Sequence, residues 1–375
     1  MKEVREILER VSAFGPNERA ILATVVDVRG SGYRLPGARM LMLENGDTFG
    51  MVSGGCLEAD VLVRARNVLQ SGRSEVFTYD TTDDENSVFS LNMGCRGVVR
   101  LLLESVGRES ILLTNLQGTR DDRVIRTVAT LISSDTSADT MLGGRLYYSG
   151  EDLFVVDRLP TFLENSQFLH NECARFHEAD SNYGFHTFET AEGAFEFGLE
   201  SIKPPVSLLL FGAGADAIPL AQIAADLGWQ VAVFDHRPAF LTSERFASAR
   251  RLVLYDRDKP IESVAGDSST VAVMMTHNYQ HDGRILPHLL RSKVAYVAAL
   301  GPKRRTEQLL GEVTSNGDSF TDEQLARLYA PAGLDIGADT PEAIALSIVA
   351  EIQSVLKSRD GGHLRNRMGS IYDRK

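Results

Sequence analysis

The chain has 375 residues, of which 43% are hydrophobic and 24% are charged, a composition typical of a globular protein with more than one domain. Acidic residues outnumber basic ones by 51 to 39, and this balance argues against nucleic-acid binding, which depends mainly on basic contacts to phosphate. Because no apolar run approaches the roughly 18 residues that span a bilayer, no signal-peptide pattern is present and cysteines number only 3, we expect a cytoplasmic protein without a membrane span.

The first forty residues predict a helix, a strand and a glycine-rich loop. Residues 3–13 form an amphipathic pattern, and 20–28 is rich in the β-branched residues that favour strands. The loop at 29–39 contains Arg34 and Arg39 among its glycines. Glycine lets a backbone approach a ligand closely, and arginine binds phosphate or carboxylate in a forked geometry. These two arginines are therefore candidate cofactor-binding residues, with a plain surface loop as the alternative.

The next segment, 53–58, reads Ser-Gly-Gly-Cys-Leu-Glu and joins a predicted β-hairpin over 38–52 to a predicted helix over 57–69. Cys56 would then lie at a helix N-terminus, where backbone N–H groups and the helix dipole favour an anion, whether a thiolate or a bound phosphate. The alternative is a small buried residue in a structural turn. The further candidate ligand-binding residues in this turn are Gly54, Gly55 and Glu58.

A second cysteine turn follows a predicted strand at 75–79. Cys95 and Arg96 lie in a Gly-Cys-Arg-Gly sequence just before a predicted strand at 98–103. A cysteine between glycines with an adjacent arginine indicates a pocket lined by backbone, and a tight turn that holds a small apolar thiol is the alternative. We expect Cys56 and Cys95 to share one site.

Residues 105–200 carry the weakest pattern. They predict strands at 127–132 and 146–148. Cys173 has histidines nearby, but no second cysteine pair completes a tetrahedral set, so no metal site is predicted. A natural linker follows at 203–205, where two prolines are adjacent.

The C-terminal half predicts a second domain with a parallel sheet. A buried strand at 206–211 leads into a G-x-G-x-x-A turn, a helix at 218–227 and a strand at 230–234 that ends in an acid, which is the order of a dinucleotide fold. The further predicted strands lie at 251–254, 271–275 and 294–298. We therefore expect an α/β protein in which an N-terminal α+β domain, 1–200, precedes a Rossmann-like doubly wound domain, 201–375.

This second domain contributes its own candidate cofactor-binding residues. Gly212 and Gly214 permit a tight turn and the close approach of a pyrophosphate. Asp235 stands where a carboxylate would accept ribose hydroxyls, and Arg237 could instead bind an additional phosphate. His277 follows a strand at the carboxyl edge, where open α/β sheets bind ligands.

Taken together, the motifs resemble those of the XdhC/CoxI family, bacterial accessory proteins of molybdenum hydroxylases such as xanthine dehydrogenase. The matching segments are 30–40, 53–58, 94–97, 211–214, 235–237, 276–277, 300–305 and 330–338. The resemblance implies a protein that binds molybdenum cofactor (molybdopterin), helps a cysteine desulfurase to add the terminal sulfido ligand, and hands the cofactor to an apo-hydroxylase. In that case Cys56 and Cys95 are thiols that bind the cofactor or handle sulfur. The chain departs from the family pattern at Arg96, Ala215 and Ala330.

Two other functions remain open on the sequence alone. The glycine turn and its acid also suit an NAD(P)-dependent oxidoreductase, whereas a thiol redox enzyme usually has a C-x-x-C pair that this chain lacks. The chain also lacks an iron–sulfur cysteine framework, so we expect a cofactor chaperone that does not oxidise purines by itself. The pattern leaves open whether the chain forms a homodimer.

Overall fold

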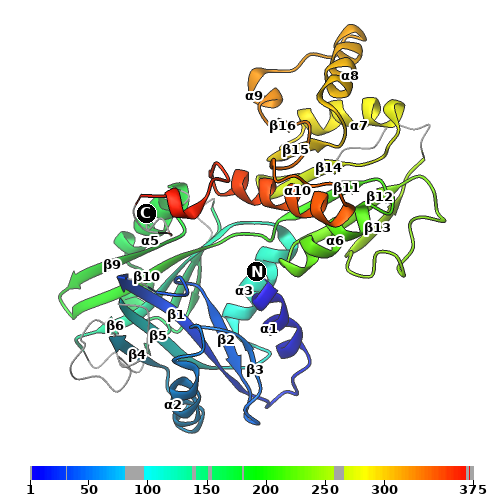
Figure 1. Cartoon of the computed structure of the whole chain (residues 1–375). Coiled ribbons are helices and arrows are strands. Elements are labelled where there is room, and N and C mark those ends of the chain that lie inside the picture. Colours follow the sequence, from blue (N-terminus) through cyan, green and yellow to red (C-terminus); the bar gives the residue numbers. More distant parts are fainter. Residues whose placement is uncertain are drawn as a thin grey trace. The chain divides into compact units, whose positions relative to one another are not determined.

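The computed structural model describes residues 2–30, 32–80, 97–136, 141–150, 154–179, 181–256, 266–368 and 371. The chain divides into two compact units, Glu3–Pro204 and Pro205–Asp373, and the division falls within the segment predicted to be a linker (Figure 1). Among the described residues, no helix is both long enough and apolar enough to cross a membrane. The mixed architecture confirms the predicted fold class, with antiparallel sheets in the first unit and a parallel sheet in the second.

The first sheet of the N-terminal unit is antiparallel and has the strand order β3-β2-β1-β5-β4. Its strands are β1 (Ala20–Gly30), β2 (Arg39–Met42), β3 (Thr48–Gly50), β4 (Glu75–Asp80) and β5 (Gly97–Val106). The predicted hairpin is confirmed, because β2 and β3 pair across a turn in which Gly46 has a φ of 93°. The strands predicted at 20–28, 75–79 and 98–103 are confirmed as well.

A second antiparallel sheet, with the order β8-β7-β6-β10-β9, occupies the segment whose sequence pattern was weakest. Its strands are β6 (Arg126–Ser134), β7 (Arg145–Tyr148), β8 (Phe154–Asp157), β9 (Tyr183–Thr190) and β10 (Gly193–Ile202). The sequence predicted only β6 and β7. The prediction of this region was therefore incomplete rather than wrong.

The two sheets pack against each other, with α2 and α5 on their outer faces and residues of α1 and α3 in the cluster that the sheets share. On the first sheet, Val25 packs with Val61 of α2 on one face, while Leu22 packs with Tyr147 of the second sheet on the other. Cys173 of α5 lies in the core on the far face of the second sheet. The helices of this unit are α1 (Lys2–Ser12), α2 (Glu58–Ser71), α3 (Ile111–Asp122), α4 (Thr161–Glu164) and α5 (Gln167–Glu178). The predicted helices at 3–13 and 57–69 correspond to α1 and α2.

Ion pairs cross the space between the two sheets. The pairs are Arg39–Glu200, Arg100–Glu196 and Arg145–Glu104, and each has N–O contacts within hydrogen-bonding distance. Charged side chains can be buried in such a position only when they are paired, because an isolated buried charge is strongly disfavoured. The inner layer of this unit is thus partly ionic.

The C-terminal unit is a six-stranded parallel sheet with the order β13-β12-β11-β14-β15-β16. Its strands are β11 (Ser207–Phe211), β12 (Gln230–Asp235), β13 (Arg251–Leu254), β14 (Thr270–Met274), β15 (Tyr296–Ala299) and β16 (Leu328–Tyr329). The strand predicted at 294–298 begins two residues later than expected, at Tyr296.

Helices pack on both faces of this sheet, as the doubly wound prediction requires. Figure 1 shows α6 and α10 side by side, and their apolar residues share one core cluster. Residues of α7 and α8 share a second cluster with the opposite face. The helices are α6 (Ala217–Asp226), α7 (Tyr279–Arg291), α8 (Lys303–Ser315), α9 (Asp322–Leu325) and α10 (Pro341–Leu356), followed by a short 3-10 helix at Leu364–Asn366.

Candidate functional site

Cys56 lies on an exposed turn between β3 and α2, directly before Leu57, the N-cap residue of α2. Gly55 makes the turn possible, because its φ of 104° strongly favours glycine, and a Cβ added there would meet nothing within 4 Å. At Gly54 an added Cβ would lie 3.5 Å from the ring of Tyr33. The predicted position at a helix N-terminus is confirmed. The alternative of a buried cysteine is wrong, since this thiol is exposed.

Ser53 organises the turn through its hydroxyl group. The side chain is buried, and its oxygen accepts hydrogen bonds from the N–H of Leu57 at 3.1 Å and of Gly55 at 3.3 Å. The thiol of Cys56 donates to the same oxygen at 3.6 Å. The Ser53 hydroxyl in turn donates to Glu58, which also accepts from the Ser53 N–H at 2.8 Å. One serine therefore fixes the thiol, the turn and the first residue of α2.

The carboxylate of Glu58 lies at this helix N-terminus, where the sequence predicts a thiolate or a bound phosphate. Burial opposes its ionisation, but hydrogen bonds from the hydroxyl and N–H of Ser53 outweigh burial and hold the pKa of Glu58 below its usual value. A carboxylate in the first turn also interacts favourably with the helix dipole. The chain thus places its own anion at this N-terminus, and the exposed thiol of Cys56 is the group left to contact a ligand.

The two arginines of the glycine-rich loop are already engaged. Arg34 contacts both carboxylate oxygens of Glu3, at 2.6 and 2.5 Å. Arg39 is buried and forms a bidentate ion pair with Glu200 at 2.9 and 2.6 Å. Both pairs satisfy the charge of the arginine without a ligand, so the predicted cofactor-binding role would require each pair to open.

Cys95 and Arg96, the second cysteine turn, lie outside the residues that the structure describes. Their proximity to Cys56 stays a prediction. The third cysteine, Cys173, is buried, and burial followed by the neighbouring charge of Glu172 raises its thiol pKa to about 12. Of the two described cysteines, Cys56 is the accessible one.

In the C-terminal unit, the G-x-G-x-x-A turn joins β11 to α6 as predicted. Gly212 has a φ of 113°, and a Cβ there would lie 2.3 Å from the carbonyl oxygen of Met275. At Gly214 an added Cβ would lie 2.4 Å from a carboxylate oxygen of Asp216. Gly212 is thus needed for close packing of backbone against backbone, whereas at Gly214 the close neighbour is the carboxylate of a side chain. The predicted contact of both glycines with a cofactor stays a prediction.

Asp235 ends β12 as predicted, but its carboxylate is occupied. One oxygen accepts from the Ala213 N–H at 2.6 Å and from Arg237 Nη2 at 2.9 Å. The other accepts from the N–H and Nε of Arg237 at 2.9 and 3.0 Å. Burial opposes ionisation, but these donors outweigh it and lower the pKa of Asp235 to about 2. The group expected to accept ribose hydroxyls is only 2% exposed and has four donors from the chain.

His277 lies just beyond β14, at the carboxyl edge of the sheet as predicted. Its Nε2 contacts the carboxylate of Asp216 at 2.7 Å, and its ring is largely exposed. Its φ is 53°, in the left-handed region that non-glycine residues rarely adopt. The contact joins the loop after β11 to the loop after β14, the point at which the order of the strands reverses.

Three contacts in these turns could not be predicted from the sequence. Ser53 and Glu58 are five residues apart, a spacing that differs from that of the usual capping box. Tyr33 belongs to the arginine loop, and its packing beside Gly54 depends on the tertiary fold. Asp216 lies 61 residues from His277, and no local pattern connects them.

Comparisons with known proteins match both units. A family model described as "XdhC and CoxI family" matches residues 15–80, and one described as "XdhC Rossmann domain" matches residues 208–352. A protein of Bacillus subtilis (strain 168), named as a probable subunit of xanthine dehydrogenase, is 31% identical to the chain over 335 residues. That similarity covers 89% of this chain and 92% of the Bacillus subtilis protein.

Two more similarities extend over nearly the whole chain. A protein of Escherichia coli (strain K12) named "Molybdenum cofactor insertion chaperone PaoD" is 23% identical over 345 residues, covering 92% of this chain and 86% of that protein. A crystal structure described as a xanthine dehydrogenase from Bacillus halodurans is 27% identical, with a TM-score of 0.73, and covers 96% of this chain and 97% of that chain.

Proposed function

We propose that this chain, which belongs to the XdhC and CoxI family, binds molybdenum cofactor as an accessory protein of a xanthine dehydrogenase-type molybdenum hydroxylase. The observation that carries the proposal is the exposed thiol of Cys56, fixed by Ser53 in a glycine turn at a helix N-terminus. The relative named as a molybdenum cofactor insertion chaperone supports it, because the alignment includes both units.

The residues of the turn fit part of this cofactor. Molybdenum with its dithiolene is a soft centre, and a thiolate is a soft ligand that suits it. Gly55 adds no side-chain bulk beside Cys56, since even a Cβ there would meet open space. The phosphate of the cofactor is less well matched, because Arg34 and Arg39 are paired with glutamates. In this proposal the chain holds and shields the cofactor as cargo, and the client hydroxylase performs the redox chemistry.

Sulfuration and delivery form the finer part of the proposal. We infer that a cysteine desulfurase acts on the cofactor while this chain holds it, and that an apo-hydroxylase then receives it. An exposed turn supports this order, because both partners need access to the bound cofactor. We place these events in the cytoplasm, and a homodimer stays an open alternative for the assembly.

The test is cofactor binding by the full chain and by single cysteine variants. Purified protein is mixed with molybdenum cofactor and freed of excess, and molybdenum per chain is measured by elemental mass spectrometry. Cys56→Ala should retain at least tenfold less molybdenum than the unmodified chain. Cys173→Ala, which removes a buried thiol, is the matched control and should retain the same amount. Cys95→Ala tests the second predicted thiol.

Equal retention by Cys56→Ala and Cys173→Ala would remove the thiol from the proposal. Delivery is tested separately, by adding the loaded chain to an apo-hydroxylase and measuring the activity that appears. If the loaded chain activates no more hydroxylase than free cofactor does, the protein binds its cargo without delivering it.

The alternative function, an NAD(P)-dependent oxidoreductase, has less support. The glycine turn is present, but Asp235 already accepts four hydrogen bonds from the chain, and Arg237 is committed to Asp235. NADH and NADPH can be titrated while the fluorescence of Trp229, the only tryptophan, is recorded. Saturable binding at micromolar concentration would restore this alternative.

A further inference from the structure

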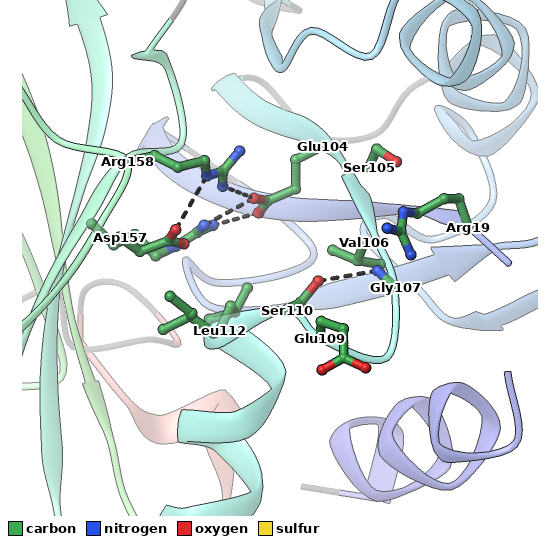
Figure 2. Close-up of a pocket in the computed structure, with 12 residues that line it drawn as sticks. Arg19, Glu104, Ser105, Val106, Gly107, Glu109, Ser110, Leu112, Asp157 and Arg158 are labelled. Carbon is green, nitrogen blue, oxygen red and sulfur yellow. Dashed lines mark hydrogen bonds and ion pairs between the residues drawn. The ribbon is translucent and has the colours of Figure 1, made fainter. Parts of the chain in front are cut away.

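The N-terminal unit contains a cavity of about 280 Å³ that shares no residue with the Ser53–Glu58 turn (Figure 2). The cavity is lined by the residue that precedes β1, by the C-terminal ends of β5 and β8, and by the first residues of α3. The lining residues that matter here are Arg19, Glu104, Gly107, Ser110, Arg145 and Arg158.

One wall of the cavity is a buried carboxylate held by two arginines. Glu104 is 1% exposed and accepts from Arg145 at 2.8 Å and from Arg158 at 2.9 Å. Asp157 lies 3.4 Å from Arg158. Arg145 balances the charge of Glu104 and Asp157 balances that of Arg158, so the charges of this wall cancel. The guanidinium of Arg158 also donates to the backbone oxygen of Gly143 at 3.2 Å. The Arg158 side chain is half exposed, and its backbone has a φ of 55°, a strained conformation of the kind that collects at functional sites.

The opposite wall holds Arg19, and Figure 2 shows Arg19 and Arg158 on opposite sides of the cavity. The guanidinium of Arg19 donates to the backbone oxygen of Glu18 at 3.2 Å, and no carboxylate of the described residues lies within ion-pair distance of it. The nearest atom to a Cβ added at Gly107 would be Arg19 Nη1, at 2.0 Å. The absence of a side chain at position 107 therefore makes room for this guanidinium.

The start of α3 forms the floor between these walls. Ser110 is its N-cap residue, but its hydroxyl accepts from the Gly107 N–H at 3.0 Å and does not cap the helix. Ile111 and Leu112, the first residues of α3, also line the cavity. Helix N-terminal N–H groups add to the attraction of the arginines for an anion. Glu109 is the opposing charge on this side, and Figure 2 shows it below Arg19.

We propose that this cavity binds a small oxyanion, a carboxylate or phosphate group of a low-molecular-weight ligand, at the guanidinium of Arg19, across the cavity from the half-exposed Arg158. The arginine fork matches the geometry of both groups, and the volume suits a ligand no larger than a few such groups. This site is independent of the proposed cofactor function. A negative result in the oxyanion-binding test would leave the proposed cofactor function unaffected, because the two sites share no residue.

The test is isothermal titration calorimetry of the full chain at low ionic strength, with inorganic phosphate in one arm and succinate in the other. Saturable binding of at least one of them is expected. Arg19→Ala should weaken it at least tenfold, and Gly107→Ala should weaken it as well by displacing the guanidinium. Arg73→Ala is the matched control, because Arg73 is exposed and lies outside the cavity, and it should bind like the unmodified chain.

The two arms distinguish the ligand groups. Binding of phosphate alone assigns a phosphate site, binding of succinate alone assigns a carboxylate site, and binding of both supports a general oxyanion site. No saturable binding in either arm overturns the proposal, and so does equal binding by Arg19→Ala and Arg73→Ala. Arg19 is exposed, so its removal leaves the core intact, and circular dichroism of each variant verifies the fold.

Discussion

The two glycine turns of this chain begin alike and end differently. Each follows a strand, contains a glycine at positive φ and leads into a helix, with a carboxylate at the helix N-terminus: Glu58 as the first residue of α2 and Asp216 before α6. The first turn leaves the thiol of Cys56 exposed. The second turn is closely packed. Gly212 lies against Met275, in the segment after β14, and the carboxylate of Asp235 accepts hydrogen bonds from the Ala213 N–H and from Arg237. A motif therefore specifies the turn, and the surrounding contacts decide whether it is open.

The largest expected loss of stability comes from adding a side chain in the closely packed turn at Gly212. Gly212→Ala would place a methyl group 2.3 Å from the oxygen of Met275 at a φ of 113°. Strain and displacement together should destabilise the C-terminal unit by about 3 kcal/mol or more. Urea unfolding followed by the fluorescence of Trp229, which lies in that unit, measures the change. A midpoint unchanged from that of the unmodified chain would mean that the turn is looser than described.

The next largest effect separates the open turn from the core of its own unit. At pH 8, iodoacetamide should modify Cys56 at least about a hundredfold faster than Cys173, because thiolate is the reactive form and burial raises the pKa of Cys173 to about 12. Mass spectrometry of the digested chain resolves the two sites. Comparable rates would show that the α5 region opens readily.

The C-terminal fold was predictable from the sequence because its strands are buried on both faces. Such strands are continuous apolar runs, as in 207–211 and 270–274, and the glycine turn and terminal acid stand beside them. The second antiparallel sheet was harder. Strand β10 alternates Phe195 and Phe197 with polar residues, which is a valid strand signal. Its glutamates, however, are partly buried against distant arginines: Glu196 pairs with Arg100, 96 residues away, and Glu200 pairs with Arg39, 161 residues away. No local pattern identifies such partners.

The same limit applies to the candidate site. The turn at Cys56 is a local feature, and its position before a helix was predictable from glycine and apolar spacing. Whether Arg39 is free or paired is not local, because its partner Glu200 lies on a strand of the second sheet. An arginine in a glycine loop has the same sequence pattern in both cases. The contact between Asp216 and His277 could not be predicted for the same reason, because the two residues are 61 positions apart in the sequence.

A smaller effect is expected on the pH dependence of stability, through the lowered pKa of Asp235. Its pKa is lowered to about 2 in the folded chain and is about 4 when unfolded. The stabilisation is therefore complete above about pH 4 and is lost as the pH falls from about 4 to about 2, amounting to about 2 kcal/mol.

Asp235→Asn measures this directly. The variant should unfold more easily than the unmodified chain at pH 7, and the difference should shrink as the pH approaches 2. Trp229 fluorescence in urea at several pH values gives both curves. A difference that stays constant from pH 7 to pH 2 would show that the charge of Asp235 contributes nothing.

The smallest effect is expected where the first turn is open. Gly55→Ala adds a methyl group that meets nothing within 4 Å, so only the backbone at a φ of 104° resists it. That cost is about 1 kcal/mol, well below the cost at Gly212. Urea unfolding of the N-terminal unit can be followed by the pulsed alkylation of buried Cys173, since Trp229 reports on the other unit. If Gly55→Ala destabilises its unit as much as Gly212→Ala does, the contrast between an open and a closed turn is lost, and with it the structural reason for placing ligand contact at Cys56.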